Sequence, residues 1–433
     1  MPTAPSSDSD AELTFVRETA AIVPDPGTYE FVGYVQPRVG IPWIHEDAPE
    51  ESVAKLLSKH GTYRSDARDD EEASDSGRGL LLSADGRLFI ERDSLFRARL
   101  EAEGGEGDHG RTHYAVRDED RAAESEFHDA PCRDPERPDE VVDLHLANGA
   151  RAVPAVGPTH EVLVSDDRPT ADTFHGGDGR SLVTSSAYPW SAVGVALLRR
   201  TSPAGQSSAS YSRSTSGTMI GPRHVLTAAH VFTDGNGVDN VLGAAPAARG
   251  YNYANDQSPY TECGFTPKFP FGIRRVQWYY WPAQWDDSGL KFDYAVLILR
   301  DNCPVLPGYI GWGYQTAHWL NYRYMNMAGY PAAWKKCEAS PEGNGDCDGY
   351  MYYQYEQTTA VYTNYAYSRF DVQEGQSGAG IYDRSGSDRH VYIIHKGSSG
   401  PYTYGKRLRS GSFSTICSWV DNWTSQYGPN PNC

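Results

Sequence analysis

The chain has 433 residues and a net charge of −18, so it is long enough for more than one domain. No apolar run approaches the ~18 residues that a membrane span needs. Neither a Walker loop, nor a dinucleotide glycine fingerprint, nor a His-Glu-x-x-His zinc helix occurs in it, which excludes the common nucleotide and metal chemistries.

The first 180 residues hold the whole excess of acidic side chains. Residues 181–433 contain 20 Lys and Arg against 18 Asp and Glu, so that part is close to neutral. Acidic stretches rich in Ser, Gly and Pro, such as 69–76, bury too little apolar surface to offset the entropy lost on ordering. We therefore interpret residues 1–170 as an acidic, partly disordered, propeptide-like region. The alternative is a separate adhesive or regulatory module that stays attached.

One segment of this region differs from its surroundings. Residues 80–90 contain two short apolar runs on either side of Asp85-Gly86. An Asp-Gly pair between apolar runs is typical of a tight turn in a β-hairpin. A hairpin is therefore expected at this place.

After residue 180, short β-branched and aromatic runs recur between Gly, Pro, Asn and Asp residues. This spacing predicts an all-β domain, an antiparallel barrel or sandwich, over residues 171–433. Only residues 414–425 have the pattern of a helix. The expected strands are 192–198, 216–220, 225–228, 275–280, 294–299, 324–328, 351–362 and 391–395.

Six of the seven cysteines lie in this C-terminal part, which favours disulfide bonds and an oxidising compartment. Six reduced, buried thiols in a cytosolic protein are the alternative, because the first residues lack a basic and apolar signal segment. Cys132 is the odd one out. Short separations in the sequence favour Cys337 with Cys347 and Cys417 with Cys433, which leaves Cys263 with Cys303.

Three motifs carry the side chains of a possible catalytic triad, in the order His230, Asp293, Ser377. A serine hydroxyl becomes a nucleophile when a base takes its proton, and the imidazolium that forms needs a carboxylate beside it. Small residues precede His230, Asp293 directly opens an apolar strand, and glycines flank the Ser377 motif. The N–H groups of Gly375 and Ser377 are candidates for an oxyanion hole, because glycine permits the unusual backbone angles that this needs.

These motifs resemble the three signatures of the chymotrypsin-fold serine proteases: Leu226-Thr227-Ala228-Ala229-His230, Asp293-Tyr294-Ala295-Val296-Leu297 and Gly375-Gln376-Ser377-Gly378. The resemblance covers roughly residues 181–425 and is stronger to the V8-like, or glutamyl endopeptidase, branch than to trypsins. Val231 follows the histidine, and Gln376 stands where trypsins have the aspartate that binds a cleaved N-terminus. The resemblance implies a double antiparallel β-barrel with a C-terminal helix, and a secreted serine endopeptidase that works through an acyl-enzyme.

Two residues near the nucleophile favour different substrates. The resemblance implies that His395 contacts an acidic side chain at the P1 position of the substrate, and Lys396 would add positive charge if it points inward. Asp371 falls where trypsin-like enzymes have the aspartate that binds Arg or Lys. Val372 replaces the hydroxyl residue of the Glu-specific members. We expect an acidic P1 preference, with cleavage after Arg or Lys as the rival.

An acidic segment ahead of a complete protease domain is typical of a zymogen. Residues 166–181 are rich in Pro, Gly and charge, so we expect them to be exposed and cleaved, with a stable fragment that begins between residues 165 and 190. Cleavage after Arg180 is one option, and Asp178-Gly179-Arg180 resembles a short Asp-Asp-Arg element of the V8-like branch.

We expect the protein to act on protein or peptide substrates, to interact with its own propeptide and to be a monomer. No cofactor, metal, nucleic acid or membrane is expected to take part. The alternative function is that of an inactive protease-fold protein that binds partners through its many tyrosines. An esterase of the α/β-hydrolase type is disfavoured, because its triad has the order Ser, Asp, His.

Overall fold

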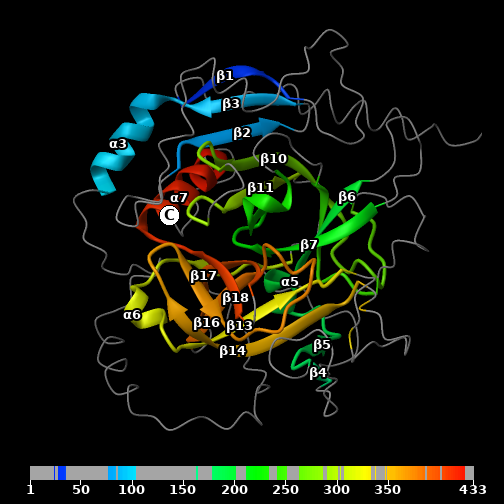
Figure 1. Ribbon diagram of the computed structural model, residues 1–433. Coiled ribbons are helices and arrows are strands. Elements are labelled where there is room, and N and C mark those ends of the chain that lie inside the picture. Colours follow the sequence, from blue (N-terminus) through cyan, green and yellow to red (C-terminus); the bar gives the residue numbers. More distant parts are fainter. Residues whose placement is uncertain are drawn as a thin grey trace, which may run out of the picture.

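Two β-barrels form the body of the molecule, and they lie one above the other in Figure 1. The computed structural model describes the residues on which all statements below rest. They are 24, 28–35, 77–83, 86–103, 162–163, 178–200, 211–233, 241–250, 263–285, 290–300, 303, 307–332, 337, 347, 349–385, 388–399 and 402–424.

The first barrel is an antiparallel sheet in which the order β10-β11-β8-β7-β6-β9 closes on itself through a pairing of β9 with β10. Strand β11 is buried along its whole length, because it belongs to the barrel wall and also packs against the C-terminal helix. The strands are β6 (Val195–Arg200), β7 (Tyr211–Met219), β8 (His224–Thr227), β9 (Val241–Pro246), β10 (Arg274–Pro282) and β11 (Ala295–Leu299).

The second barrel closes in the same way, with the order β13-β16-β17-β18-β15-β14 and a pairing of β13 with β14. Short strands extend it at β14 and β17. The barrel strands are β13 (Tyr324–Gly329), β14 (Met351–Val361), β15 (Tyr365–Ser368), β16 (Gly380–Ser385), β17 (Asp388–Ser399) and β18 (Tyr402–Arg407), and the added ones are β4 (Val162–Leu163), β5 (Ser181–Val183) and β12 (Gly311–Trp312). The expected double antiparallel β-barrel is therefore confirmed.

Helices are few within the described ranges. They are α3 (Asp93–Glu103), α5 (Trp190–Val193), α6 (Ala317–Leu320), α7 (Ser410–Thr424) and the 3₁₀ turn η2 (Ala229–Val231). Helix α7 is the expected C-terminal helix, and it begins a turn earlier than the sequence indicates. The expected strand at 192–198 starts only at Val195, because the residues before it form α5. Of the described helices, none has the length and apolar character that crossing a membrane requires.

The expected hairpin at residues 80–90 is present, and it is part of the first barrel's sheet. Strands β2 (Gly79–Ser83) and β3 (Arg87–Glu91) pair antiparallel, β1 (Tyr29–Tyr34) adds to β3, and β2 pairs with β10. Gly86 has φ +84, and its N–H donates to the carbonyl of Ser83, as a tight turn requires. Figure 1 shows these three strands above β10.

The hairpin covers an aromatic layer of the first barrel. Leu80, Leu81 and Leu82 are at most 2% exposed. Behind them Trp419 of α7 stacks between Tyr280 and Tyr294, with ring centroids 5.6 Å from each. The described strands β1, β2 and β3, which precede residue 170, therefore belong to the same sheet as the first barrel.

Candidate active site

Two neighbouring strands of the first barrel bring His230 and Asp293 together. Strands β8 and β11 are antiparallel, with Thr227 opposite Ala295, so the residues after β8 and those before β11 lie at the same edge of the sheet. The fully buried alanines 228 and 229 let the 3₁₀ turn with His230 lie close against that edge. The geometry follows directly from the small residues and the apolar run seen in the sequence.

The contacts between these two residues fix the imidazole. Asp293 Oδ2 lies 2.8 Å from His230 Nδ1, and Asp293 Oδ1 accepts a hydrogen bond from the His230 backbone N–H at 3.0 Å. Asp293 is fully buried, whereas a fifth of the His230 side chain is exposed. An aspartate in this position holds one tautomer of the histidine, with the proton on Nδ1, and leaves Nε2 to act as a base.

Lys396 also binds this aspartate, a contact for which the sequence held no signal. Its Nζ lies 3.2 Å from Asp293 Oδ2 and 4.7 Å from the centre of the Trp285 ring. The sequence left open whether Lys396 points toward an acidic P1 side chain. In the structure it points to the carboxylate of Asp293 instead. Burial alone would raise the pKa of Asp293, but the charge and hydrogen bonds of His230, together with the charge of Lys396, lower it below its usual value.

The nucleophile loop depends on two glycines with positive φ, Gly375 at +100 and Gly378 at +86. A Cβ on Gly375 would lie 2.5 Å from Ala332 N, and one on Gly378 would lie 2.1 Å from Thr227 Oγ1. Both positions therefore need glycine for conformation and for space. The backbone N–H groups of Gly375 and Ser377 donate no hydrogen bond within the described part of the chain, as an oxyanion hole requires.

Ser216 joins this loop to the first barrel, and sequence reasoning did not find it. Its Oγ donates to the carbonyl of Gly375 at 2.9 Å and accepts from the N–H of Tyr330 at 2.9 Å. Its N–H donates to the carbonyl of Ser377 at 2.9 Å. Because Ser216 lies in β7, these bonds fix the two barrels relative to each other at the nucleophile.

The hydroxyl of Ser377 donates to the carbonyl of Lys396 at 2.8 Å. It forms no hydrogen bond to His230 in this structure, so Oγ must turn about the Cα–Cβ bond to give its proton to Nε2. Contacts between a base and the group it deprotonates are often long or misaligned in structures without substrate and tighten when substrate binds. The strand that carries His395 and Lys396 lies directly beside the serine, because Gly378 N–H donates to the His395 carbonyl at 2.8 Å.

His395 is buried and neutral. Its side chain is 1% exposed, and Nδ1 has no hydrogen-bond partner among the described residues. Burial, and to a lesser degree the charge of His230, lower the pKa of His395 to about 3. A carboxylate would therefore meet a neutral imidazole there, which can donate one hydrogen bond and carries no charge.

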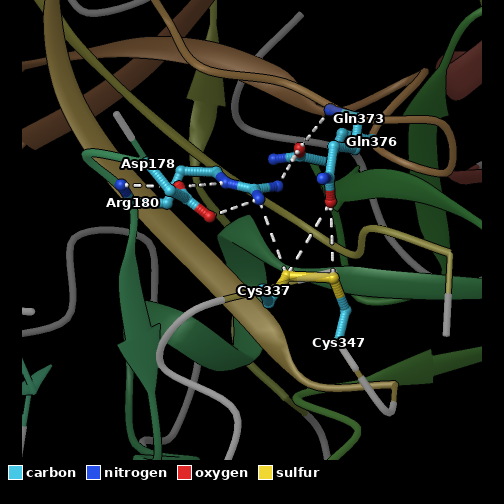
Figure 2. Close-up of a disulfide and its surroundings, with 6 residues drawn as sticks. All are labelled: Asp178, Arg180, Cys337, Cys347, Gln373 and Gln376. Carbon is cyan, nitrogen blue, oxygen red and sulfur yellow. Dashed lines mark hydrogen bonds and ion pairs between the residues drawn. A yellow bond between two sulfur atoms is a disulfide. The ribbon is translucent and has the colours of Figure 1, made fainter. Parts of the chain in front are cut away.

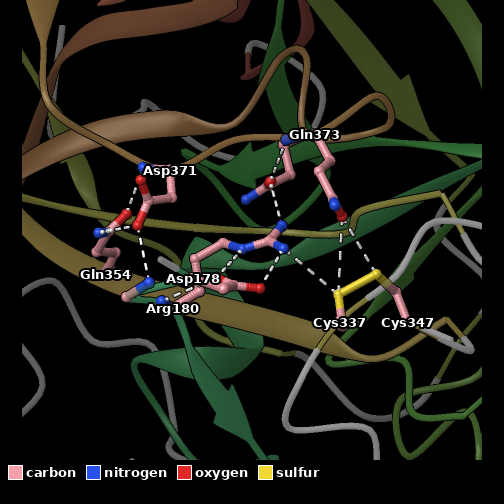
Figure 3. A network of polar contacts seen from close by, with 9 residues as sticks. Asp178, Arg180, Cys337, Cys347, Gln354, Asp371 and Gln373 are labelled. Carbon is pink, nitrogen blue, oxygen red and sulfur yellow. Dashed lines mark hydrogen bonds and ion pairs between the residues drawn. A yellow bond between two sulfur atoms is a disulfide. The ribbon is translucent and has the colours of Figure 1, made fainter. Parts of the chain in front are cut away.

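The other two predicted pocket residues are engaged elsewhere. Asp371 is 2% exposed, and its Oδ2 accepts hydrogen bonds from Gly179 N at 2.8 Å and from Gln354 Nε2 at 3.1 Å, as Figure 3 shows in part. Val372 belongs to the apolar core of the second barrel. The geometry therefore disfavours Asp371 as a receptor for a basic P1 side chain.

Two of the three expected disulfides are present, Cys263–Cys303 and Cys337–Cys347. The third pair includes Cys433, and Cys132 is the odd cysteine; both lie outside the described residues. Cys417 lies in α7. No group of three or more His, Cys, Asp or Glu side chains is arranged to hold a metal in the described ranges.

The chain is similar in sequence to a known protease. It is 25% identical over 259 residues to a glutamyl endopeptidase of Bacillus licheniformis, and the alignment covers 57% of this chain and 69% of that protein. A solved Glu endopeptidase is 18% identical, with a TM-score of 0.41, over 57% of this chain and 97% of that one. The protease Anisep of Arthrobacter nicotinovorans is 17% identical, with a TM-score of 0.37, over 52% and 94%. No protein-family model matches.

Two closed six-stranded antiparallel barrels, with His230, Asp293 and Ser377 near their junction, form a chymotrypsin-like fold. The similarity in sequence to a glutamyl endopeptidase agrees with this fold.

Proposed function

We propose that the protein hydrolyses peptide bonds through a triad of His230, Asp293 and Ser377. The observation that carries this proposal is the double contact of Asp293 with the side chain and backbone of His230, at the edge where the nucleophile loop meets the first barrel. A carboxylate that touches both groups orients the imidazole and balances its charge when it takes a proton.

The reaction follows from these positions. His230 Nε2 takes the proton of Ser377 Oγ as Oγ bonds to the substrate carbonyl carbon, and the oxygen that becomes negative accepts hydrogen bonds from the N–H groups of Gly375 and Ser377. As the carbon–nitrogen bond breaks, His230 gives this proton to the leaving amine. Water then attacks the acyl-enzyme, and the same histidine acts as its base.

Substrates with an acidic P1 residue fit this site best. The buried His395 offers a donor to a carboxylate on the strand beside Ser377, and its Nδ1 has no other partner among the described residues. The rival, cleavage after Arg or Lys, would need Asp371, whose Oδ2 already accepts two hydrogen bonds. The glutamyl endopeptidase relative adds weight to the acidic choice.

Peptides that differ only at P1 test this preference. We expect kcat/KM to be higher for Glu than for Met, which has a similar size but no acceptor oxygen, and His395→Ala to remove most of that ratio, because a site built to hydrogen-bond a substrate group discriminates strongly against its absence. Asp371→Asn serves as the matched control and should leave the ratio unchanged. A preference for Arg or Lys that persists in His395→Ala and disappears in Asp371→Asn would establish the rival.

The protein is further proposed to be a secreted, monomeric zymogen. The two disulfides support an oxidising compartment. Cleavage after Arg180, however, does not fit the structure, because Asp178, Arg180 and Ser181 are each at most 9% exposed. We therefore place the activating cleavage before Asp178. The expected start of the mature fragment is then between residues 165 and 178. N-terminal sequencing of the most active form tests this, and a start at Ser181 or an active intact chain would contradict it.

A binding protein without activity is the second candidate, supported by exposed tyrosines such as Tyr322 and Tyr355. Incubation with a peptide library, read by mass spectrometry, separates the two. Cleavage by the wild type and none by Ser377→Ala establishes the peptidase, and no cleavage by either leaves the binding function.

A further inference from the structure

A buried arginine lies behind the nucleophile loop. The guanidinium of Arg180 forms a two-point ion pair with Asp178, in which Nη2 lies 2.6 Å from Oδ2 and Nε lies 2.7 Å from Oδ1. Its plane approaches the Tyr352 ring at 5.4 Å. Figure 2 shows the side chain extended between Asp178 on one side and the Cys337–Cys347 disulfide and Gln376 on the other.

Arg180 contacts the residue that precedes the nucleophile. Its Nη1 donates to Gln376 Oε1 at 3.0 Å, and the same oxygen accepts from the N–H of Gln373 at 2.9 Å. Gln376 is 1% exposed and Arg180 is 2% exposed, so water does not compete for these bonds. The side chain of Gln376 is thus held from both sides, and the peptide units that carry the Gly375 and Ser377 N–H groups are attached to it.

The adjoining backbone is fixed to the same loop. Gly179 N–H donates to Asp371 Oδ2, and a Cβ at residue 179 would lie 3.0 Å from Gln354 Nε2 and 3.1 Å from that oxygen. Gly179 therefore lets the segment Asp178–Arg180 come close to the start of the loop while Arg180 holds its end. Figure 3 shows both attachments in one network, with Asp371 and Gln354 at one side and the disulfide at the other.

The buried guanidinium of Arg180 therefore supports the loop of residues 373–377. We infer that Arg180 is a positioning residue, which holds the oxyanion-binding conformation of residues 373–377 through Gln376. In this arrangement the loop needs no free N-terminal amine, because the guanidinium is already covalently present and neutralised by Asp178. It follows that Asp178–Arg180 must stay with the active chain wherever the cleavage before it occurs.

The inference rests on the proposed peptidase function. It is tested by the kinetics of the Arg180→Met variant, produced as the full chain and assayed in its most active form. We expect kcat to fall by about 10²-fold, the effect of losing one oxyanion-hole donor, with KM changed far less. A peptide aldehyde, which places its tetrahedral oxygen in the hole, should lose affinity by a similar factor. Arg180→Lys, which keeps one donor and the charge, should recover part of kcat.

Two further variants make the test specific. Gln376→Met removes the same contact but leaves the Arg180–Asp178 pair, so it should lower kcat as Arg180→Met does, and the double variant should be no worse than either. It also tests the contact if Arg180→Met does not fold. Arg323→Met is the control, because Arg323 is another ion-paired arginine of the second barrel, 2.9 Å from Asp383; kcat should not change.

The outcomes distinguish this inference from the function on which it rests. If the wild type cleaves peptides while folded Arg180→Met or Gln376→Met keeps its kcat, the positioning role is wrong and the peptidase stands. If the wild type is inactive and Ser377 reacts with no aldehyde, the proposed function fails first.

Discussion

At the scale of single residues, Lys396 distinguishes this triad from one in which the aspartate serves the histidine alone. One oxygen of Asp293 receives both His230 Nδ1 and Lys396 Nζ. The contacts of His230 and the charge of Lys396 stabilise the ionised form of this carboxylate, which agrees with the lowered pKa of Asp293.

Removing that charge should therefore make the protein less stable toward acid. Lys396 lowers the pKa of Asp293, so in Lys396→Met this carboxylate takes up a proton at higher pH, and the loss of thermal stability as pH falls should begin at higher pH than in the wild type. Lys396→Arg keeps the charge and should retain the wild-type profile. The same pH profile of thermal stability in all three proteins would show that the ion pair has no electrostatic role.

Buried histidines determine a second pH effect, on stability. Burial lowers the pKa of His224 and His395 to about 3. The unfolded chain binds these protons from about pH 6.5 downward and the folded one does not, so the free energy of unfolding should fall as pH falls from about 7 toward 3. At pH 5 each histidine lowers the free energy of unfolding by about 2 kcal/mol relative to neutral pH. His224→Leu should reduce the loss in thermal stability between pH 7.5 and pH 5, and an unchanged loss would contradict the assignment.

At the scale of elements, the upstream hairpin behaves as a structural part of the first barrel. Strand β2 continues the sheet beyond β10, and Gly77 N–H donates to the hydroxyl of Tyr294, the residue after the triad aspartate. Removing the hairpin would expose the edge of β10 and the leucines and aromatic rings that it now buries. We therefore expect the hairpin to stay bound to the first barrel after an activating cleavage.

A core substitution in the hairpin should therefore destabilise the catalytic barrels. Leu81 is fully buried, so Leu81→Ala should cost about 2–5 kcal/mol, a loss that lowers the unfolding midpoint followed by fluorescence of the buried tryptophans. Leu95→Ala is the matched control, because Leu95 of α3 is 41% exposed. Equal midpoints for the Leu81→Ala protein and the control would show that the hairpin folds independently of the barrels.

The sequence predicted those elements whose signal is local. The apolar runs of β8 and β11, the Asp-Gly turn and the three triad motifs can be read without the fold, since each depends on neighbouring residues. Strand β9, Val241–Pro246, was missed, because it is rich in Gly and Ala and owes its conformation to its partners β6 and β10. The roles of Ser216, Arg180 and Lys396 depend on contacts between distant segments, which no local pattern contains.

At the scale of the whole molecule, the proposed active site draws on both barrels and on two segments that precede them in the chain. The first barrel supplies His230 and Asp293, the second supplies Ser377, and Ser216 joins them by hydrogen bonds to the nucleophile loop. The segment around Arg180 supports that loop from behind, and the upstream hairpin supports the barrel that carries Asp293. Catalysis is therefore expected to be sensitive to changes well outside the triad.

Labelling with a fluorophosphonate, followed by mass spectrometry of the intact protein and of its peptides, tests most directly whether Ser377 is a nucleophile activated by His230. We expect one covalent adduct, at Ser377, that is absent in Ser377→Ala and forms far more slowly in His230→Ala, because loss of a triad member typically costs ~10⁴-fold or more. An adduct at another residue, or labelling of Ser377 at an undiminished rate in His230→Ala, would contradict it.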